Sequence, residues 1–210
     1  MEEKLKIIFD CVLNGDRKGV DAAVMAALAD TPAHEILFNA MVPAMDEVGN
    51  LYEQGEYFVP EMLVAAHAMR SGLVLLKPYL KDGGVEPLGK IAIGTVKGDL
   101  HDIGKNLVSM MLEGAGFEIL DLGADVGPEK FIAAIHSGAQ IIGLSALLTT
   151  TMPQMQLIIN SIRAAGLRDK VKIIIGGAPV TQAFADQIGA DGFAPDASSS
   201  VALARTLIKN

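Results

Sequence analysis

Apolar side chains recur at intervals of three and four residues through the first 82 positions, a spacing typical of amphipathic helices. Four such apolar faces follow one another along the chain, over residues 5–12, 20–28, 37–52 and 62–80. Pro60 suits the first turn of the last helix, whereas Pro43 is expected to kink or loosen the third one. Because the loops between these helices are short, we expect a bundle of four antiparallel helices over residues 1–82.

The pattern changes after residue 82. The stretch "KDGGVEPLGK", residues 81–90, contains three glycines and a proline and has no apolar period, so we expect a linker over residues 83–89. Beyond it, short apolar runs predict strands at 90–96, 117–123, 141–146, 171–177 and 191–194, and helical stretches at 103–115, 128–137, 152–165, 180–188 and 198–208. Apolar strands that alternate with helices predict a parallel five-stranded sheet covered on both sides. This is a doubly wound, Rossmann-like (flavodoxin-like) α/β domain over residues 90–210.

Composition places the chain among compact proteins. Half of its 210 residues are apolar and 20% are charged, which excludes a disordered chain. A net charge of −8 argues against nucleic acid as a partner, because phosphate binding relies on clustered Lys and Arg. The longest apolar runs are shorter than the ~18 to 20 residues that cross a bilayer, and the N-terminus lacks the features of a secretory signal. With Cys11 as the single cysteine, we expect a cytoplasmic protein without a membrane span.

Residues that are unusual for a covered sheet gather where the predicted strands end. The first strand is followed by "VKGDLHDIG", the third by "SALLTTT", the fourth by "GGAP" and the fifth by "PDASSS". Because ligands of an open parallel sheet bind outside the carboxyl ends of its strands, these four loops are expected to form one polar rim. One histidine, many hydroxyl groups and a pair of glycines there could together bind one large, extended ligand.

Each of these residues also has an ordinary structural interpretation. The stretch "GTVKGDLHDIGKN" lacks the spacing of a phosphate-binding loop, so nucleotide binding there is disfavoured. Asp102 could cap the helix that begins at Ile103, and His101 alone could be a hydrogen-bonded loop residue. The presence of Asp99 favours a functional role for His101 over an ordinary structural one. The Asp99 carboxylate can hold the proton of one ring nitrogen of His101 and leave the other nitrogen basic.

The sequence contains no convincing catalytic group that acts without a cofactor. Ser145 lacks the context of a nucleophile elbow and is expected to form hydrogen bonds. Gly176 and Gly177 could serve a strand-to-loop transition or a ligand that passes close to the backbone. The other histidines are scattered without metal-ligand spacing, so a zinc site is disfavoured. We therefore predict a cofactor that supplies the reactivity.

Three short motifs resemble the cobalamin-binding signature Asp-x-His-x-x-Gly, Ser-x-Leu, Gly-Gly. They are "DLHDIG" at residues 99–104, Ser145 with Leu147, and Gly176-Gly177, in that order. The stretch "AMDEVGNLYEQGEYFVPEMLVAAHAMRSG" is similar to the helical cap of methionine synthase and of the small corrinoid proteins of methyltransferase systems. The resemblance covers almost the whole chain. It is closest to free-standing corrinoid proteins that shuttle methyl groups from methylamines, methanol, methoxylated aromatics or betaines.

The resemblance implies a role for each matching residue. His101 would be the lower axial ligand of cobalt in place of the cofactor's own benzimidazole, Asp99 would hold its other ring nitrogen, and Thr151 would complete a proton relay. The remaining cobalamin contacts implied in the α/β domain are Gly98, Leu100, Asp102, Gly104, Ser145, Leu147, Thr149, Gly176, Gly177 and Ala197. In the cap, Tyr52 and Val59 fall where the family places bulky residues over the upper face of the corrin, and a valine is smaller than usual there.

The implied function is that of a methyl carrier. Cobalt in its Co(I) state would accept a methyl group from a substrate-specific methyltransferase, and the methyl-Co(III) form would deliver it through a second methyltransferase to tetrahydrofolate or a thiol. We also expect a reductive activase as a partner and a mobile cap with its hinge at residues 82–89. Two other classes stay open. The cobalamin-binding subunit of an adenosylcobalamin mutase is disfavoured by the helical cap, and a cobalamin-dependent sensor would normally need a further domain.

Overall fold

The computed structural model describes residues 2–82 and 86–209, which form two compact units. The first comprises the chain up to Pro87 together with Glu113–Gly116, and the second comprises Leu88–Leu112 and the chain from Phe117 onward. Residues 83–85 of the predicted linker lie outside the described residues, and the chain from 86 to 89 leads without a helix or strand into the first strand. The predicted domain limits and the hinge remain predictions.

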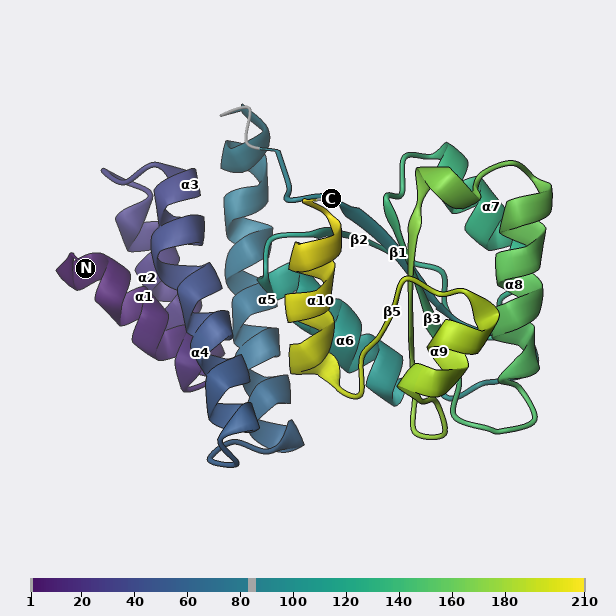
Figure 1. Cartoon of the computed structure of the whole chain (residues 1–210). Helices are drawn as coiled ribbons and strands as arrows, with labels where there is room; N and C mark the ends of the chain where they lie inside the picture. Colours follow the sequence, from purple (N-terminus) through teal and green to yellow (C-terminus); the bar gives the residue numbers. More distant parts are fainter. Residues whose placement is uncertain (1, 83–85, 210) are drawn as a thin grey trace. The chain divides into compact units, whose positions relative to one another are not determined.

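Four helical rods build the first unit in the described part of the chain, as the apolar period predicts (Figure 1). They are α1 (Glu3–Leu13), α2 (Arg17–Ala27), a composite rod of α3 (Ala33–Ile36), η1 (Leu37–Met41) and α4 (Val42–Glu53), and finally α5 (Val59–Asp82). Ile8, Val24, Met41 and Met69 are fully or almost fully buried on these helices. Burial of an apolar face, more than helix propensity, stabilises helices of this length. The predicted four-helix cap is confirmed.

The third rod widens just before Pro43, where the sequence predicts a kink or a loosening. The segment η1 is a π-helix, and the Val42 N–H at its end donates to the Leu37 carbonyl, five residues earlier. Because Pro43 has no N–H, a regular α-helix would leave the Asn39 carbonyl without its intrahelical partner. π-Helices are rare and occur mostly as single-turn bulges inside α-helices, where they mark a local irregularity such as this one. The predicted single helix is therefore three contiguous segments.

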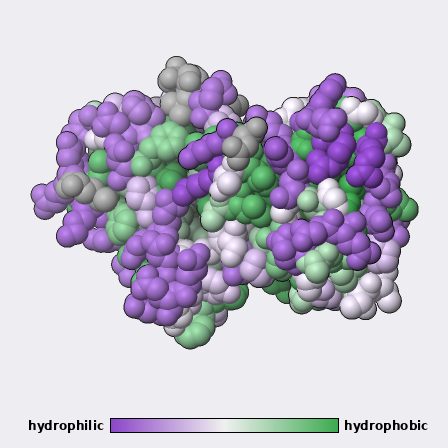
Figure 2. All heavy atoms as spheres, in the orientation of Figure 1, coloured by the Kyte–Doolittle hydropathy of each residue, from purple (hydrophilic) through white to green (hydrophobic). Residues whose placement is uncertain are grey.

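By length and composition alone, α5 could cross a membrane. Its window Val59–Leu80 has a mean hydropathy of 1.3, and 39% of that window is buried inside the protein. Met62, Met69 and Leu76 lie on the buried side, which is typical of a core helix in a soluble protein. Figure 2 shows hydrophilic residues over much of the visible face of the helical unit. One such helix, partly buried in the protein, is weak evidence for a membrane span.

Five parallel strands form the sheet of the second unit. They are β1 (Lys90–Thr95), β2 (Glu118–Asp121), β3 (Ile141–Ser145), β4 (Lys172–Gly176) and β5 (Gly192–Phe193). Their order in the sheet is β2-β1-β3-β4-β5, and every neighbouring pair is parallel. The chain adds a strand on one side of β1 and then continues on the other side, so a topological switch point lies between β1 and β3. This order confirms the predicted flavodoxin-like fold.

Helices cover both faces of this sheet (Figure 1). They are α6 (Ile103–Gly114), α7 (Pro128–His136), α8 (Pro153–Ala164), α9 (Gln182–Ile188) and α10 (Ala197–Leu207), with a short 3-10 turn, η2 (Arg168–Lys170), before β4. Helices α7, α8 and α9 share an apolar core with one face of the sheet, in which Phe131, Ile158, Ile173 and Ile175 are fully buried. Helices α6 and α10 cover the other face. The predicted elements agree with these to within two residues, because a covered parallel strand needs an unbroken apolar run.

Gly177 follows β4, where the backbone approaches the chain after β3. It has a φ of +126°, and a Cβ built on it would lie 1.9 Å from the Ala146 carbonyl oxygen. A residue with a side chain could adopt neither that φ nor that approach without a shift of the backbone. A Cβ on Gly176 would meet the Ala194 carbonyl oxygen at 3.0 Å, which is a milder constraint. The strand-to-loop transition alone therefore requires glycine at 177, and a ligand beside this glycine pair remains a prediction.

We expect Gly177→Ala to lower the free energy of unfolding by about 3 kcal/mol or more, because the added Cβ overlaps the backbone and strains φ. Gly104→Ala in α6 is the matched control, since a Cβ there meets no atom within 4 Å. Its effect should stay within about 1 kcal/mol. Urea unfolding followed by circular dichroism measures both. Equal effects of the two substitutions would contradict the close approach as the cause.

Candidate functional site

The predicted site residues come together at the switch point of the sheet. Strands β1 and β3 are neighbours, and their last residues, Thr95 and Ser145, are paired in register. The loops that follow these strands therefore start side by side at the carboxyl edge, where ligands of this fold bind. The first loop carries Asp99 and His101, and the second carries Thr151.

The carboxylate of Asp99 is the buried centre of this arrangement, with no exposed surface. Its Oδ1 accepts a hydrogen bond from the His101 backbone N–H at 3.1 Å and lies 2.7 Å from the ring Nδ1 of His101. Its Oδ2 accepts from the backbone N–H groups of Leu147 at 2.8 Å and Leu148 at 3.3 Å, and from the Thr151 hydroxyl at 2.8 Å. A charge buried without partners is strongly unfavourable, so these five donors stabilise the ionised form. They also join the two loops through one side chain.

Two opposing effects act on the pKa of Asp99. Burial raises this pKa, whereas hydrogen bonds from the His101 ring, the Leu147 N–H and the Thr151 hydroxyl lower it and outweigh burial. The pKa is therefore held well below its ordinary value. At neutral pH the group is a carboxylate, which can only accept hydrogen bonds.

The ionised carboxylate decides the tautomer of His101. Because Asp99 can only accept, Nδ1 must carry the hydrogen that joins the two side chains, and the neutral ring then has its lone pair on Nε2. The His101 side chain is 52% exposed, so the ring stands at the surface above a buried partner. A histidine whose other nitrogen is held by a carboxylate is the usual arrangement of a metal-binding histidine in proteins.

Thr151 lies where the resemblance places the last residue of the relay. Its side chain is buried, and its Oγ1 is 2.8 Å from Asp99 Oδ2 and 2.9 Å from the Leu148 carbonyl oxygen. The hydroxyl has one hydrogen, and of these two oxygens the carboxylate is the stronger acceptor. A threonine here therefore makes the contact expected of a serine, with a normal hydrogen-bond length. Its role in proton transfer remains a prediction.

Exposed apolar side chains flank the motif residues on both loops. Leu100 and Ile103 are each 76% exposed, and Leu147 and Leu148 are 43% and 41% exposed. Large apolar side chains left in solvent on adjacent loops favour a ligand with a broad apolar face. Leu100 and Leu147 were predicted through the motif, whereas sequence reasoning missed Ile103 and Leu148. The only signal for these two is their apolar character next to motif positions, at the first residue of α6 for Ile103 and in the loop after β3 for Leu148.

Three other motif positions shape the chain before and within the first turn of α6. Gly98 has a φ of +81°, in the left-handed region that favours glycine. The Asp102 carboxylate accepts a hydrogen bond from the side-chain amide of Asn106 at 3.2 Å. A capping side chain would instead accept from a backbone N–H, so the role of Asp102 as a helix cap remains a prediction. Gly104 faces open space, because a Cβ built there would meet nothing within 4 Å. A large ligand could therefore approach this turn closely.

The residues predicted to contact the tail of the cofactor lie at the same edge of the sheet. Ser145 ends β3, Gly176 ends β4 and Ala197 begins α10. Thr149 lies exposed in the loop after β3. They line the ends of three neighbouring strands, as a ligand extended across the edge would require.

The two predicted cap residues belong to the helical unit. Tyr52 lies near the end of α4 and is half-buried, and Val59 begins α5 with 42% of its surface exposed. Phe58, which sequence reasoning did not single out, precedes Val59 and is 64% exposed. The place of these side chains over a corrin remains a prediction.

The α/β residues fit a metal that arrives with most of its own ligands. Within residues 2–82 and 86–209, no three His, Cys, Asp or Glu side chains cluster as a metal site. One exposed nitrogen, on His101, is too little for a bare ion but could serve as one ligand to a metal held by a macrocycle. The exposed apolar side chains beside it suit the macrocycle itself. Fold and site thus define a class of protein that binds a metal-containing macrocycle at the carboxyl edge of a flavodoxin-like sheet.

Comparison with known proteins identifies that class. One B12 binding domain family matches residues 89–203, and a second B12 binding domain family matches residues 5–77. The chain is 44% identical over 209 residues to dimethylamine corrinoid protein 3 of Methanosarcina acetivorans. This match covers 99% of the present chain and 98% of that protein. The chain belongs to the family of B12-binding corrinoid proteins.

Two solved structures agree with this assignment. A cobalamin-binding protein from Desulfitobacterium hafniense DCB-2 superposes with a TM-score of 0.80 at 32% identity, over 97% of this chain and 98% of that one. The methanol:cobalamin methyltransferase complex MtaBC from Methanosarcina barkeri contains a chain with a TM-score of 0.88 at 27% identity, over 100% of this chain and 81% of that one. The cofactor of the present protein is cobalamin or a related corrinoid, as the motifs predict.

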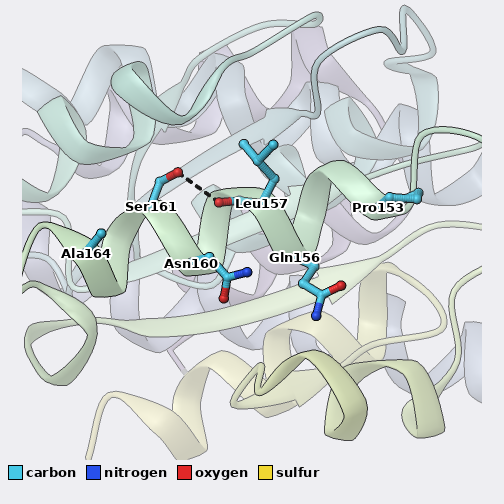
Figure 3. Close-up of a pocket in the computed structure, with 6 residues that line it drawn as sticks. All are labelled: Pro153, Gln156, Leu157, Asn160, Ser161 and Ala164. Atoms are coloured by element: carbon cyan, nitrogen blue, oxygen red, sulfur yellow. Dashed lines mark hydrogen bonds between the residues drawn. The ribbon is translucent and has the colours of Figure 1, made fainter.

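A separate recess on α8 does not belong to this site (Figure 3). Its lining consists of Pro153, Gln156, Leu157, Asn160, Ser161 and Ala164. The Ser161 hydroxyl donates to the Leu157 carbonyl at 2.9 Å, within the helix. All six residues come from one helix, none is charged, and none was predicted to contact the cofactor.

We expect Asp99→Asn to lower the free energy of unfolding by about 2 to 3 kcal/mol at neutral pH, because the amide places a donor against other donors. The folded pKa of Asp99 lies below its unfolded value. Its stabilisation is therefore present above the unfolded pKa of about 4 and is lost as the pH falls through the lower folded value. The difference between wild type and variant should shrink as the pH is lowered below about 4.

Chemical unfolding of the cofactor-free protein at a series of pH values measures this difference. Asp102→Asn is the control, because the side chain of Asp102 is exposed and bonds another side chain. A difference between wild type and Asp99→Asn that stays constant down to about pH 3 would contradict the account of Asp99.

Proposed function

We propose that this corrinoid protein is a methyl carrier, which takes a methyl group from one methyltransferase and presents it to a second one. The observation that carries the proposal is the Asp99–His101 pair, in which a buried carboxylate 2.7 Å from Nδ1 leaves Nε2 as an exposed basic nitrogen. The similarity of the chain to a dimethylamine corrinoid protein and to a chain of a methanol:cobalamin methyltransferase complex supports the proposal. The cobalt of the bound corrinoid supplies the atom on which a methyl group can be carried.

In this proposal His101 would hold the cobalt of the corrinoid through Nε2. Asp99 holds the Nδ1–H, keeps the ring in one tautomer and stabilises the positive charge that the ring gains when it donates electrons or takes up a proton. Asp99 would keep the ring in place whether or not Nε2 is bound to the metal. Thr151 donates to the other carboxylate oxygen and would hold Asp99 in this position.

The other predicted residues divide between the ring and the tail of the cofactor. Leu100, Leu147, Ile103 and Leu148 would cover the apolar lower face of the corrin and keep water from the axial bond. Gly98, Asp102 and Gly104 would shape the backbone around it. Ser145, Thr149, Gly176, Gly177 and Ala197 would contact the nucleotide tail. Tyr52 and Val59 would cover the upper face, with the hinge of the cap at residues 82–89.

The donor that we propose is a methylated amine, with dimethylamine as the first candidate, because a relative with that name is 44% identical over 99% of this chain. Tetrahydrofolate or a thiol would receive the methyl group through the second methyltransferase, and a reductive activase would restore the reduced cofactor in the cytoplasm. The mutase-subunit and sensor hypotheses are not favoured, since the match to corrinoid proteins includes the helical unit.

The proposal is tested with the protein loaded with cobalamin. Wild type should bind with the absorbance spectrum of histidine-ligated cobalamin, whereas His101→Ala should bind with that of cobalamin without an axial base, because an alanine side chain has no nitrogen to offer. After reduction, the wild type should take up one methyl group per cobalt from a dimethylamine-specific methyltransferase with its substrate.

Trimethylamine-specific and methanol-specific methyltransferases serve as comparisons for the donor. His136→Ala is the control, since His136 lies at the end of α7 and is not one of the predicted site residues. Identical spectra of wild type and His101→Ala would reject His101 as the ligand. A reduced protein that no methyltransferase can methylate would reject the carrier function.

A further inference from the structure

The loop that carries Asp99 and His101 is also held at two points from outside the Asp-x-His motif. We propose that Asp125 and Thr95 are positioning residues, which fix the place and direction of the His101 ring for the metal of the corrinoid. This inference rests on the proposed function. Neither residue belongs to the cobalamin-binding motifs, and each acts on the ligand through the backbone of its loop.

Asp125 lies in the loop between β2 and α7, beside the loop that follows β1. Its Oδ1 accepts a hydrogen bond from the Gly98 N–H at 2.8 Å, and its own backbone N–H donates to the Asp99 carbonyl at 3.0 Å. Its Oδ2 lies 3.3 Å from Lys97 Nζ. The hydrogen bond from the Gly98 N–H lowers the pKa of Asp125 most, and the hydrogen bond from Lys97 lowers it further. The side chain is therefore an ionised acceptor. One residue thus contacts three successive residues of the neighbouring loop.

The backbone of Asp125 shows that this contact is maintained against strain. Its φ is 55°, and among the described residues it is the one non-glycine residue in the left-handed region. Aspartate tolerates that region better than most residues, but glycine would adopt it without strain. Such a conformation persists where the surrounding structure over-determines it. Here Val126 N–H donates to the Thr95 carbonyl at 2.9 Å and Thr95 N–H donates to the Gly123 carbonyl at 3.0 Å, on either side of Asp125 and its loop.

Thr95 holds the other end of the ligand loop. It is fully buried at the end of β1, and its Oγ1 donates to the His101 carbonyl at 2.9 Å. The His101 N–H and ring Nδ1 are both bound to Asp99. The backbone of His101 is therefore fixed on both sides, by Asp99 at its N–H and by Thr95 at its carbonyl.

These restraints matter because the ring itself has little packing to hold it. Half of the His101 side chain is exposed, so its direction depends on hydrogen bonds more than on neighbouring side chains. A metal ligand must be held close to its productive geometry by its supporting contacts. Loss of the Gly98 or His101 anchor would let the loop shift while Asp99 and His101 remain paired. The fold would survive, and fewer of the bound corrinoid molecules would be ligated by His101.

Two pairs of variants separate the anchors from the fold. Asp125→Gly keeps the left-handed backbone and removes the acceptor for Gly98, whereas Asp125→Asn keeps an acceptor oxygen. Thr95→Val removes the donor to His101 at nearly constant volume, whereas Thr95→Ser keeps it. Asp16→Ala is the matched control, because Asp16 accepts a hydrogen bond from the Gly19 N–H at 2.9 Å in the helical unit. Each variant is loaded with cobalamin, and circular dichroism confirms its fold.

The first measurement is the ratio of histidine-ligated to unligated cobalamin, read from the absorbance spectrum of the loaded protein. Because one hydrogen bond is lost, Asp125→Gly and Thr95→Val should each lower this ratio by about 3- to 10-fold. Asp125→Asn, Thr95→Ser and Asp16→Ala should stay near wild type. The second measurement is the rate of amide hydrogen exchange at Gly98 in the cofactor-free protein. This rate should rise by a similar factor in Asp125→Gly and stay near the wild-type rate in the other four variants.

Folded Asp125→Gly and Thr95→Val proteins with the wild-type ratio would overturn the inference. An equal shift in Asp16→Ala would overturn it as well, since a general loss of stability would then explain the effect. If Thr95→Val does not fold, the inference is tested by the ligation ratios of Asp125→Gly and Asp125→Asn and by amide hydrogen exchange at Gly98. A wild type without histidine ligation would reject the proposed function, while unchanged exchange at Gly98 in Asp125→Gly would reject the Asp125 anchor independently.

Discussion

The site depends on one buried charge, the carboxylate of Asp99. Five hydrogen-bond donors surround it, and they come from the loop after β1 and from the loop after β3. If these loops separated, a buried carboxylate would lose its partners, which is among the larger penalties that a fold can incur. The same contacts keep the carboxylate ionised and so place the proton of His101 on Nδ1. Stability and ligand geometry therefore share one set of hydrogen bonds.

The sheet topology makes this set of contacts possible. The strand order brings the ends of β1 and β3 together in register, and Gly177 allows the chain after β4 to approach the chain after β3. On this frame the protein provides one nitrogen, a group of exposed apolar side chains and a rim of hydroxyl groups. The corrinoid brings the metal and its other ligands. In the proposed function this division leaves the reactivity to the cofactor.

The positions of the strands and helices of the α/β unit could be predicted to within two residues, because covered strands require apolar runs. The Asp99–His101 pair and Thr151 could also be predicted, since a short motif and a fixed spacing carry them. The Leu147 and Leu148 donors could not, because every residue but proline has a backbone N–H. Asp125 was missed for another reason. Its role depends on the β2–α7 loop lying beside the β1 loop, which no local pattern of the sequence encodes.

The proposed function requires that His101 supply the nitrogen that binds the cobalt. Electron paramagnetic resonance of the Co(II) form tests it directly, because the unpaired electron is split by the nucleus of its axial nitrogen. The protein is produced with histidine labelled with nitrogen-15 and is loaded with unlabelled cobalamin. We expect the splitting pattern to change to that of nitrogen-15. A pattern that keeps the splitting of ordinary nitrogen would assign the ligand to the cofactor's own base and contradict the account.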